Sequence, residues 1–164
     1  MSRGAVVADP TVRDFLRNAD PVLARLIDAH PGFRPRAWID ELPALDAFGM
    51  LVFQVIGQQL SVSATRTILS RLEEHFGGHL PSSAELLAAD PQVLRDSGMS
   101  ARKGQTLRAL AERFVDGRLS DEALSGMTDD EVEAVLTEVP GIGPWTAHGF
   151  LIFALDRPDV LLSG

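Results

Sequence analysis

Residues 136–147 read LTEVPGIGPWTA. The Pro-Gly-Ile-Gly turn at 140–143 separates two apolar helical patterns, because proline and glycine end helices. Gly143 can cap the second helix, and Pro144 suits its first position. The stretch therefore predicts two helices joined by a tight hairpin, with Ile142 as an apolar plug.

A capping box marks where the first of these helices begins. The hydroxyl of Thr128 can accept a hydrogen bond from the third helical amide, while Glu131 reaches back to the cap residue. Apolar residues follow at helical spacing, at Val132, Val135, Leu136 and Val139. We therefore expect one face of this helix to be buried.

The hairpin turn is a candidate phosphate site. Its main-chain amides and the positive end of the second helix can hold an anionic oxygen, and glycines let a nucleic-acid backbone come close. No basic side chain is needed for such a site. The residues assigned to DNA-backbone binding here are Pro140, Gly141, Ile142, Gly143 and Thr146.

These residues resemble the helix-hairpin-helix motif of DNA-repair glycosylases, and the chain resembles the 3-methyladenine DNA glycosylase II branch of that superfamily. The similarity begins near residue 45 and includes the segments 56–61, 97–103 and 156–160. It implies an all-α, multi-helix, two-lobed DNA glycosylase fold with its final helices missing. Helix caps recur along the chain and no strand-like alternation is evident, which also favours an all-α fold.

Two domains are expected. Residues 1–44 form N-terminal helices, starting at Asp9-Pro10 and Asp20-Pro21, and a proline-containing linker at 30–43. Residues 45–164 form the helix-hairpin-helix glycosylase domain, incomplete at its C-terminus. Its first helix is strongly apolar, and further helices are predicted from Ser61, Asp90-Pro91 and Ser100.

The segment 56–61, which reads IGQQLS, resembles the loop that such glycosylases push into the duplex. Gln59 or Leu60 would then act as the wedge that replaces an extruded nucleotide in the base stack. The alternative interpretation of this segment is a polar helix end.

Trp145 distinguishes between two kinds of glycosylase chemistry. Superfamily members that also cleave the DNA strand carry a lysine nucleophile at this position, two residues beyond the second hairpin glycine. An indole cannot attack C1′, so water is the expected nucleophile, and Trp145 can stack on a cationic alkylated purine. Trp145 and His148 are assigned to the base pocket. The alternatives are a tryptophan that fills the seam between lobes and a surface histidine.

The resemblance places the catalytic aspartate immediately after Gly164, where it would stabilise an oxocarbenium-like sugar. No catalytic residue is thus expected within the chain, which we expect to be inactive. Asp156 and Asp159 precede that position, and loop-structuring roles are expected for both. Enzymes of this kind often place an aromatic near Gly149, so a base pocket of different shape is expected here.

The formal net charge of −8 opposes DNA binding when it is taken whole. The acidic excess lies entirely in residues 119–164, whereas basic residues gather earlier, at Arg102, Lys103, Arg108, Arg113 and Arg118. This group is either a helix face with internal ion pairs or a phosphate-facing stripe. Arg102 and Lys103 are assigned to DNA-backbone binding.

The 164 residues contain no cysteine, so they cannot ligate an iron–sulfur cluster. No other cofactor is expected apart from a monovalent cation at the hairpin, and a metal site is left unassigned.

The expected partner is double-stranded DNA with a damaged base, not a membrane, and the expected location is the cytoplasm, at chromosomal DNA. Apolar surface at residues 45–60, exposed by the missing helices, is expected to promote self-association.

Three functions compete. The first is a monofunctional glycosylase of base excision repair that flips damaged, alkylated purines and hydrolyses their N-glycosidic bonds. The second is a noncatalytic DNA-binding module that uses the same hairpin. The third is an acidic protein-interaction domain in which the hairpin is only a turn.

Overall fold

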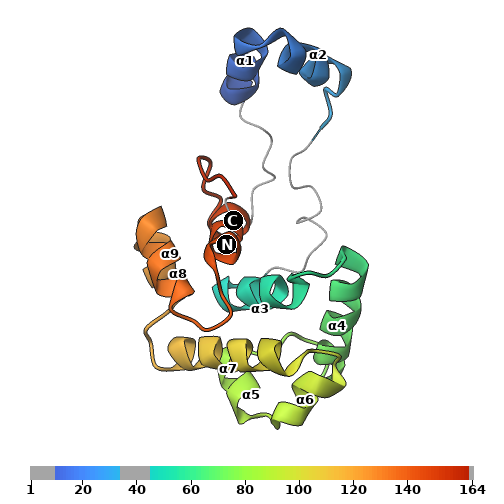
Figure 1. Ribbon diagram of the computed structural model, residues 1–164, viewed down its shortest axis with the longest axis vertical. Helices are drawn as coiled ribbons and strands as arrows, with labels where there is room; N and C mark the ends of the chain where they lie inside the picture. Colours follow the sequence, from blue (N-terminus) through green and yellow to red (C-terminus); the bar gives the residue numbers. More distant parts are fainter. Residues whose placement is uncertain (1–9, 34–44, 163–164) are drawn as a thin grey trace. The chain divides into compact units, whose positions relative to one another are not determined.

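The computed structural model describes residues 10–33 and 45–162, and all regular secondary structure in these ranges is helical (Figure 1). The all-α prediction is confirmed. The chain divides into two compact units, Met1–Ala44 and Leu45–Gly164. Within the described ranges, no helix has both the length and the apolar character needed to cross a bilayer.

The first unit contains a pair of helices, α1 (Pro10–Ala19) and α2 (Pro21–Ala29). The carboxylate of Asp20 caps α2 by accepting hydrogen bonds from the N–H groups of Val22 and Leu23, at 2.6 and 3.1 Å. This is the start that the Asp-Pro pair predicts. Most of the linker expected at 30–43 lies outside the described residues.

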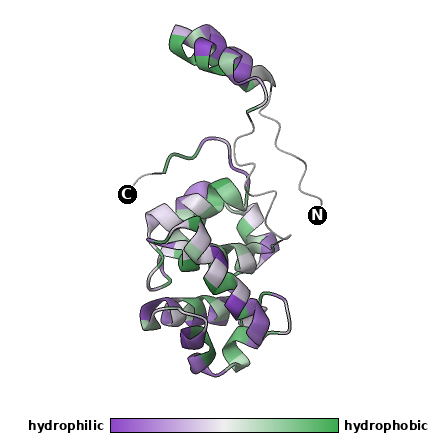
Figure 2. Cartoon of the chain, turned by 90° about the vertical axis from the view of Figure 1, so that its right-hand side faces the viewer, coloured by the Kyte–Doolittle hydropathy of each residue, from purple (hydrophilic) through white to green (hydrophobic). Residues whose placement is uncertain are grey.

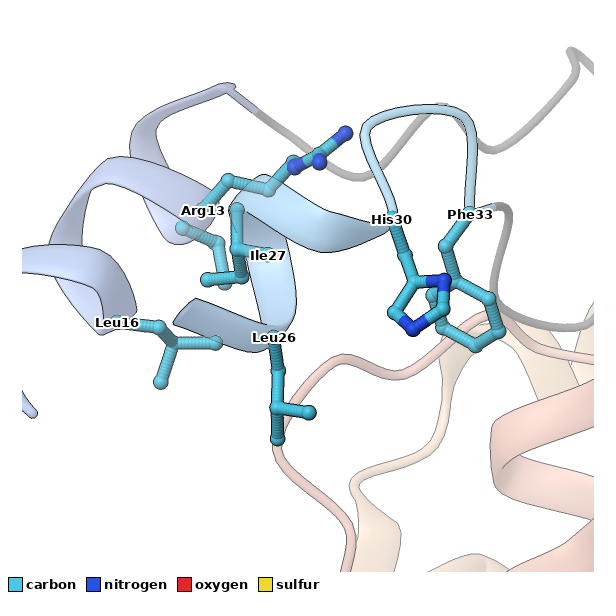
Figure 3. A pocket seen from close by; sticks show the side chains of 7 residues that line it. Arg13, Leu16, Leu26, Ile27, His30 and Phe33 are labelled. Atoms are coloured by element: carbon cyan, nitrogen blue, oxygen red, sulfur yellow. The ribbon is translucent and has the colours of Figure 1, made fainter. Parts of the chain in front are cut away.

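Apolar side chains of the α1–α2 pair remain exposed, and α2 buries none of its residues. Phe15 is 70% exposed, Leu26 54% and Phe33 68%. A pocket of about 550 Å³ lies within this unit, and its lining comes from both helices and the turn after α2 (Figure 3). It is lined by Val12, Arg13, Leu16, Leu26, Ile27, His30 and Phe33.

The second unit is built around α3 (Ala47–Gly57), in which nine residues are buried. Asp46 caps the helix by accepting from the N–H of Gly49 at 2.7 Å, and Asp121 accepts from the N–H of Ala47 at 2.7 Å. The expectation of exposed apolar surface at residues 45–60 is wrong for this helix, because α4, α7 and α10 pack around it. Leu60, after the helix, is 41% exposed.

Four helices follow α3: α4 (Val62–His75), α5 (Ser83–Ala88), α6 (Pro91–Asp96) and α7 (Ala101–Val115). The predicted caps at Ser61, Asp90 and Ser100 begin α4, α6 and α7. Helix α5 was not predicted, although Ser82 and Glu85 form a capping box at its start. Hydrophilic and hydrophobic residues alternate along these helices, as expected where one face packs inward (Figure 2).

The last three helices are α8 (Asp121–Gly126), which was not predicted, α9 (Asp129–Thr137) and α10 (Pro144–Phe153). The predicted capping box begins α9: the N–H of Thr128 donates to Glu131 at 2.8 Å, and the N–H of Glu131 donates to the threonine hydroxyl at 3.3 Å. Helices α9 and α10 pack against each other across the hairpin. The sequence thus correctly predicts both helices of the motif.

Candidate nucleic-acid interface

The hairpin between α9 and α10 presents unpaired main-chain donors. Ile142 is only 5% exposed and plugs the turn, and its N–H donates to the carbonyl of Val139 at 3.0 Å. Within the described part of the chain, the N–H groups of Gly141, Gly143 and Trp145 donate no hydrogen bond. Three donors therefore remain at the N-terminal end of α10, where the helix dipole also favours an anion.

Glycine is required at residue 141. Its backbone is left-handed, with φ of 94°, and the Thr106 hydroxyl occupies the space that a β-carbon would need. That hydroxyl donates to the carbonyl of Pro140 at 2.8 Å, so α7 supports the turn from behind. Gly143 differs, because a β-carbon there would meet open space.

Gln58 joins the end of α3 to the hairpin. Its side-chain N–H₂ group donates to the carbonyl of Gly141 and to the hydroxyl of Thr146, both at 3.1 Å. Thr146 is only 3% exposed and serves this junction. The segment predicted to insert into the duplex therefore lies beside the segment predicted to bind phosphate, although more than 80 residues separate them in sequence.

The wedge candidates follow directly after this junction, and both are exposed. Gln59 has φ of 59°, a left-handed conformation that is uncommon for residues other than glycine. Such backbone strain occurs preferentially at functional sites, where surrounding contacts maintain it. The geometry leaves Gln59 and Leu60 free to enter a duplex, and their role as a wedge stays a prediction.

Lys103 was assigned to the DNA backbone, but its ammonium group holds the end of α3. It donates to the carbonyls of Ile56 and Gln58, at 2.7 and 2.8 Å. Burial lowers the pKa of Lys103 from its ordinary value. The carbonyls left without helical partners at the end of α3 therefore use two of the three donors of this cation, and its phosphate contact stays a prediction.

Three other basic residues of this region also have partners within the fold. Arg108 donates to the carbonyls at the end of α5, Arg113 pairs with Glu138 at 2.7 Å, and Arg118 pairs with Asp116 at 2.6 Å. Arg102 is exposed, and its side chain makes no hydrogen bond or ion pair with any described residue. A phosphate contact therefore stays a prediction for Arg102, whose guanidinium is the more available of the two assigned cations.

Trp145 is 53% exposed in the first turn of α10. The alternative role of this indole, filling the seam between lobes, stays open. The ring is available for stacking, next to the unpaired amides of the hairpin.

His148, which the sequence assigns to the base pocket, contacts a residue of α9. Its Nε2 atom is 2.6 Å from a carboxylate oxygen of Glu133, so the ring joins α10 to α9. The side chain is 13% exposed. His148 therefore joins the two helices of the motif, and its assignment to the base pocket stays a prediction.

Several acidic residues of the C-terminal region have hydrogen-bond or ion-pair partners within the fold. The pKa of Glu131 is lowered because the backbone N–H and then the hydroxyl of Thr128 donate to it. Four other carboxylates also have partners, namely Asp121, Asp129, Glu133 and Glu138. These carboxylates stay ionised and are held at fixed positions by the fold, so the negative charge of this region remains part of what a phosphate would meet.

The loop after α10 is fixed by Arg157, whose guanidinium donates to the carbonyls of Ser125 and Met127, at 3.3 and 2.8 Å. Asp156 adopts a left-handed backbone with φ of 56°, and Asp159 is exposed.

Among described residues, no three His, Asp or Glu side chains gather as a metal site. A cation at the hairpin would use main-chain oxygens, and the carbonyls of Pro140 and Gly141 each keep one lone pair.

Comparison with known proteins agrees with this arrangement. Residues 52–161 match the family described as HhH-GPD superfamily base excision DNA repair protein. The chain belongs to this superfamily. DNA-3-methyladenine glycosylase 1 of Schizosaccharomyces pombe is 30% identical over 148 residues, covering 89% of this chain and 64% of the relative. DNA-3-methyladenine glycosylase 2 of Escherichia coli is 32% identical, covering 85% of this chain and 50% of the relative.

Solved structures show the same fold. The 3-methyladenine DNA glycosylase of S. pombe in complex with abasic DNA superimposes with a TM-score of 0.81 at 29% identity, over 92% of this chain and 73% of that one. A DNA-3-methyladenine glycosidase from Bacillus halodurans gives 0.74 at 33% identity, over 94% and 68% of the two chains. The predicted glycosylase fold is confirmed. The chain spans about half to two thirds of the length of the two relatives described above.

Proposed function

We propose that this chain is the DNA-gripping and base-flipping part of a monofunctional DNA glycosylase that acts on damaged, alkylated purines in base excision repair. One observation carries the proposal: three unpaired main-chain N–H groups lie at a helix N-terminus beside an exposed indole. The amides suit a phosphate oxygen, and the indole suits a planar, cationic base.

The chemistry follows from the groups at the site. The hairpin amides hold the strand, Gln59 or Leu60 fills the gap in the base stack, and Trp145 receives the flipped base. Water then adds to C1′ and loses a proton to a nearby carboxylate, while the C1′–N bond breaks and the cationic base leaves as a neutral molecule with the bonding electron pair. The same carboxylate stabilises the positive sugar, and we expect it at the position following Gly164. Without a lysine at residue 145, strand cleavage through a Schiff base is not expected.

The names of relatives support this substrate class. The S. pombe and E. coli relatives are both called DNA-3-methyladenine glycosylases, and the S. pombe structure contains abasic DNA. We propose the same broad class of lesion here, at chromosomal DNA in the cytoplasm. We also propose that catalysis needs no cofactor, iron–sulfur clusters included, beyond a monovalent cation at the hairpin.

Substitution at Gly143 tests the phosphate site. This residue caps α10 without a side-chain hydrogen bond, and a side chain there meets open space. Gly143→Asp should cap the helix well but place a negative charge where the phosphate binds. Gly143→Asn caps without the charge and is the matched control. Thermal unfolding and fluorescence anisotropy with an abasic-analogue duplex measure the two effects.

We expect both variants to fold at least as stably as the parent chain. Gly143→Asp should weaken duplex binding by about tenfold or more, and Gly143→Asn by about threefold at most. Equal, salt-insensitive binding by all three proteins would instead favour the acidic protein-interaction domain.

The enzyme and the DNA-binding module are distinguished by product release. A chain extended past Gly164 should liberate free base from methylated duplex DNA, and replacing the first acidic residue after Gly164 should abolish the release. Duplex binding without any release of base would identify the noncatalytic module.

We further propose that this chain self-associates. Because most of residues 45–60 are buried, the contact surface is the exposed apolar face formed by α1, α2 and the turn after α2. Phe15, Leu26 and Phe33 give this face three large exposed apolar side chains. Apolar surface of this kind is normally covered by another protein surface.

A further inference from the structure

Helix α3 presents two glutamines, one turn apart, toward α10. Gln58 has its side-chain N–H₂ group bonded by the hairpin, as described above. Gln54 differs: its side-chain oxygen and nitrogen are both inaccessible to solvent, and neither forms a hydrogen bond with any described residue. The residue as a whole is half-buried, so only its polar end is covered.

A buried carboxamide without partners opposes folding, because its hydrogen bonds to water are lost and not replaced. Methionine would fill the same volume without that cost. Core stability therefore does not explain a glutamine at residue 54. Buried polar groups that lack partners are exceptions in folded proteins, and each calls for an explanation, of which a functional role is one.

Gly149 makes room for this carboxamide. A β-carbon at residue 149 would lie 2.8 Å from the side-chain oxygen of Gln54, so any larger residue would displace the amide. Gly149 is buried and lies four residues after Trp145, on the same side of α10. The amide of Gln54 thus lies against a residue that is one helical turn, roughly 6 Å along the axis, from Trp145.

We propose that Gln54 is a specificity-determining residue that reads the polar edge of a base stacked on Trp145. A carboxamide offers a donor and an acceptor side by side, and it complements purines that present an acceptor and a donor side by side. No hydrogen bond holds the amide against Gly149 among the described residues, so side-chain rotation can bring it toward the base. This inference rests on the proposed base-flipping function.

Two lesions and an abasic analogue provide the test, with binding to duplex DNA measured by anisotropy for residues 1–164. Hypoxanthine carries a carbonyl beside an N–H group, whereas the fused ring of 1,N6-ethenoadenine removes the donors from that edge. A tetrahydrofuran abasic site has no base to read. The variants are Gln54→Met and Gln54→Leu, and Gln105→Met on the exposed face of α7 is the matched control.

The parent chain and Gln105→Met should bind the hypoxanthine duplex about fivefold more tightly than the ethenoadenine duplex. Gln54→Met and Gln54→Leu should bring this ratio within twofold of unity, with abasic binding unchanged and with thermal stability equal or higher. A ratio that is the same in the parent and in both Gln54 variants, with abasic binding intact, would overturn the inference alone. Failure of the parent to prefer abasic over undamaged duplex would overturn the proposed function as well.

Discussion

The side-chain hydroxyl of Thr106 lies against the α-carbon of Gly141, in the space that a β-carbon at residue 141 would occupy. The contact ties α7 to the hairpin, because the same hydroxyl donates to the carbonyl of Pro140. The shape of the phosphate-binding turn therefore depends on a residue 35 positions earlier in the sequence.

Gly141→Ala should destabilise the chain and weaken duplex binding. The left-handed backbone and the contact with Thr106 together predict a loss of about 2–4 kcal/mol in the free energy of unfolding. Urea denaturation measures it. Gly143→Ala is the matched control, because its β-carbon meets nothing, and it should cost about 1 kcal/mol or less. In the Gly141→Ala background, Thr106→Ala should recover part of the loss. Equal stability of the two glycine variants would contradict this account.

Lys103 and Arg102 are adjacent but should respond differently to substitution. Lys103→Met removes the donor to the carbonyls of Ile56 and Gln58, and should lower the free energy of unfolding by about 1–3 kcal/mol. Arg102→Met should leave stability within about 0.5 kcal/mol, because the guanidinium is exposed and makes no hydrogen bond or ion pair with a described residue.

The salt dependence of duplex binding separates the two roles. Arg102→Met should reduce the slope of log K against log salt concentration by about 0.9, the value for one phosphate contact. Lys103→Met should leave the slope nearly unchanged. A reduced slope for Lys103→Met with an unchanged slope for Arg102→Met would indicate that Lys103, and not Arg102, contacts a phosphate.

Local signals predicted the motif well. The capping box at Thr128 and Glu131, the Gly143-Pro144 start and the apolar spacing between them all act within a few residues, so sequence spacing reveals them. The same logic was available for α5, where Ser82 and Glu85 form an identical box that went unrecognised.

The candidate site depends on contacts that sequence spacing does not determine. In the sequence Lys103 looks like a free cation, but in the structure it donates to two carbonyls that are 45 and 47 residues away. His148 likewise meets Glu133 only because the hairpin folds α10 back on α9. In both cases the polar residue is visible in the sequence, but only tertiary packing selects its partner.

Acid should remove a stabilising contribution at the start of α5. The pKa of Glu85 is lowered from 4.5 to about 2, mainly because the backbone N–H of Ser82 donates to it, followed by the Ser82 hydroxyl and His79. The folded state therefore binds fewer protons than the unfolded state between these values. The contribution is fully present above pH 4.5 and is lost as the pH falls toward about 2.

Glu85→Gln should consequently unfold at a lower temperature than the parent at pH 7. The difference in Tm should narrow below pH 4.5 and close near pH 2. Glu74→Gln, at an exposed position of α4, is the matched control and should show no such convergence. A Tm difference independent of pH would mean that the charge of Glu85 does not support the cap.

Removing apolar surface from the first unit should reduce self-association. Phe15 and Leu26 are 70% and 54% exposed, and water-exposed apolar area favours contact with a second copy. Analytical ultracentrifugation of the parent chain should show a mass that rises with protein concentration. The double variant Phe15→Ser, Leu26→Ser should remain monomeric over the same range.

Val115→Ser gives the matched control, because Val115 is equally exposed, at 54%, but lies at the end of α7 in the second unit. It should associate as the parent does, since the proposed contact uses only α1 and α2. Duplex binding should be preserved in all three proteins, because the hairpin lies in the second unit. A parent chain that stays monomeric throughout would refute self-association. If Val115→Ser lost self-association as fully as the double variant, the contact would instead lie on the second unit.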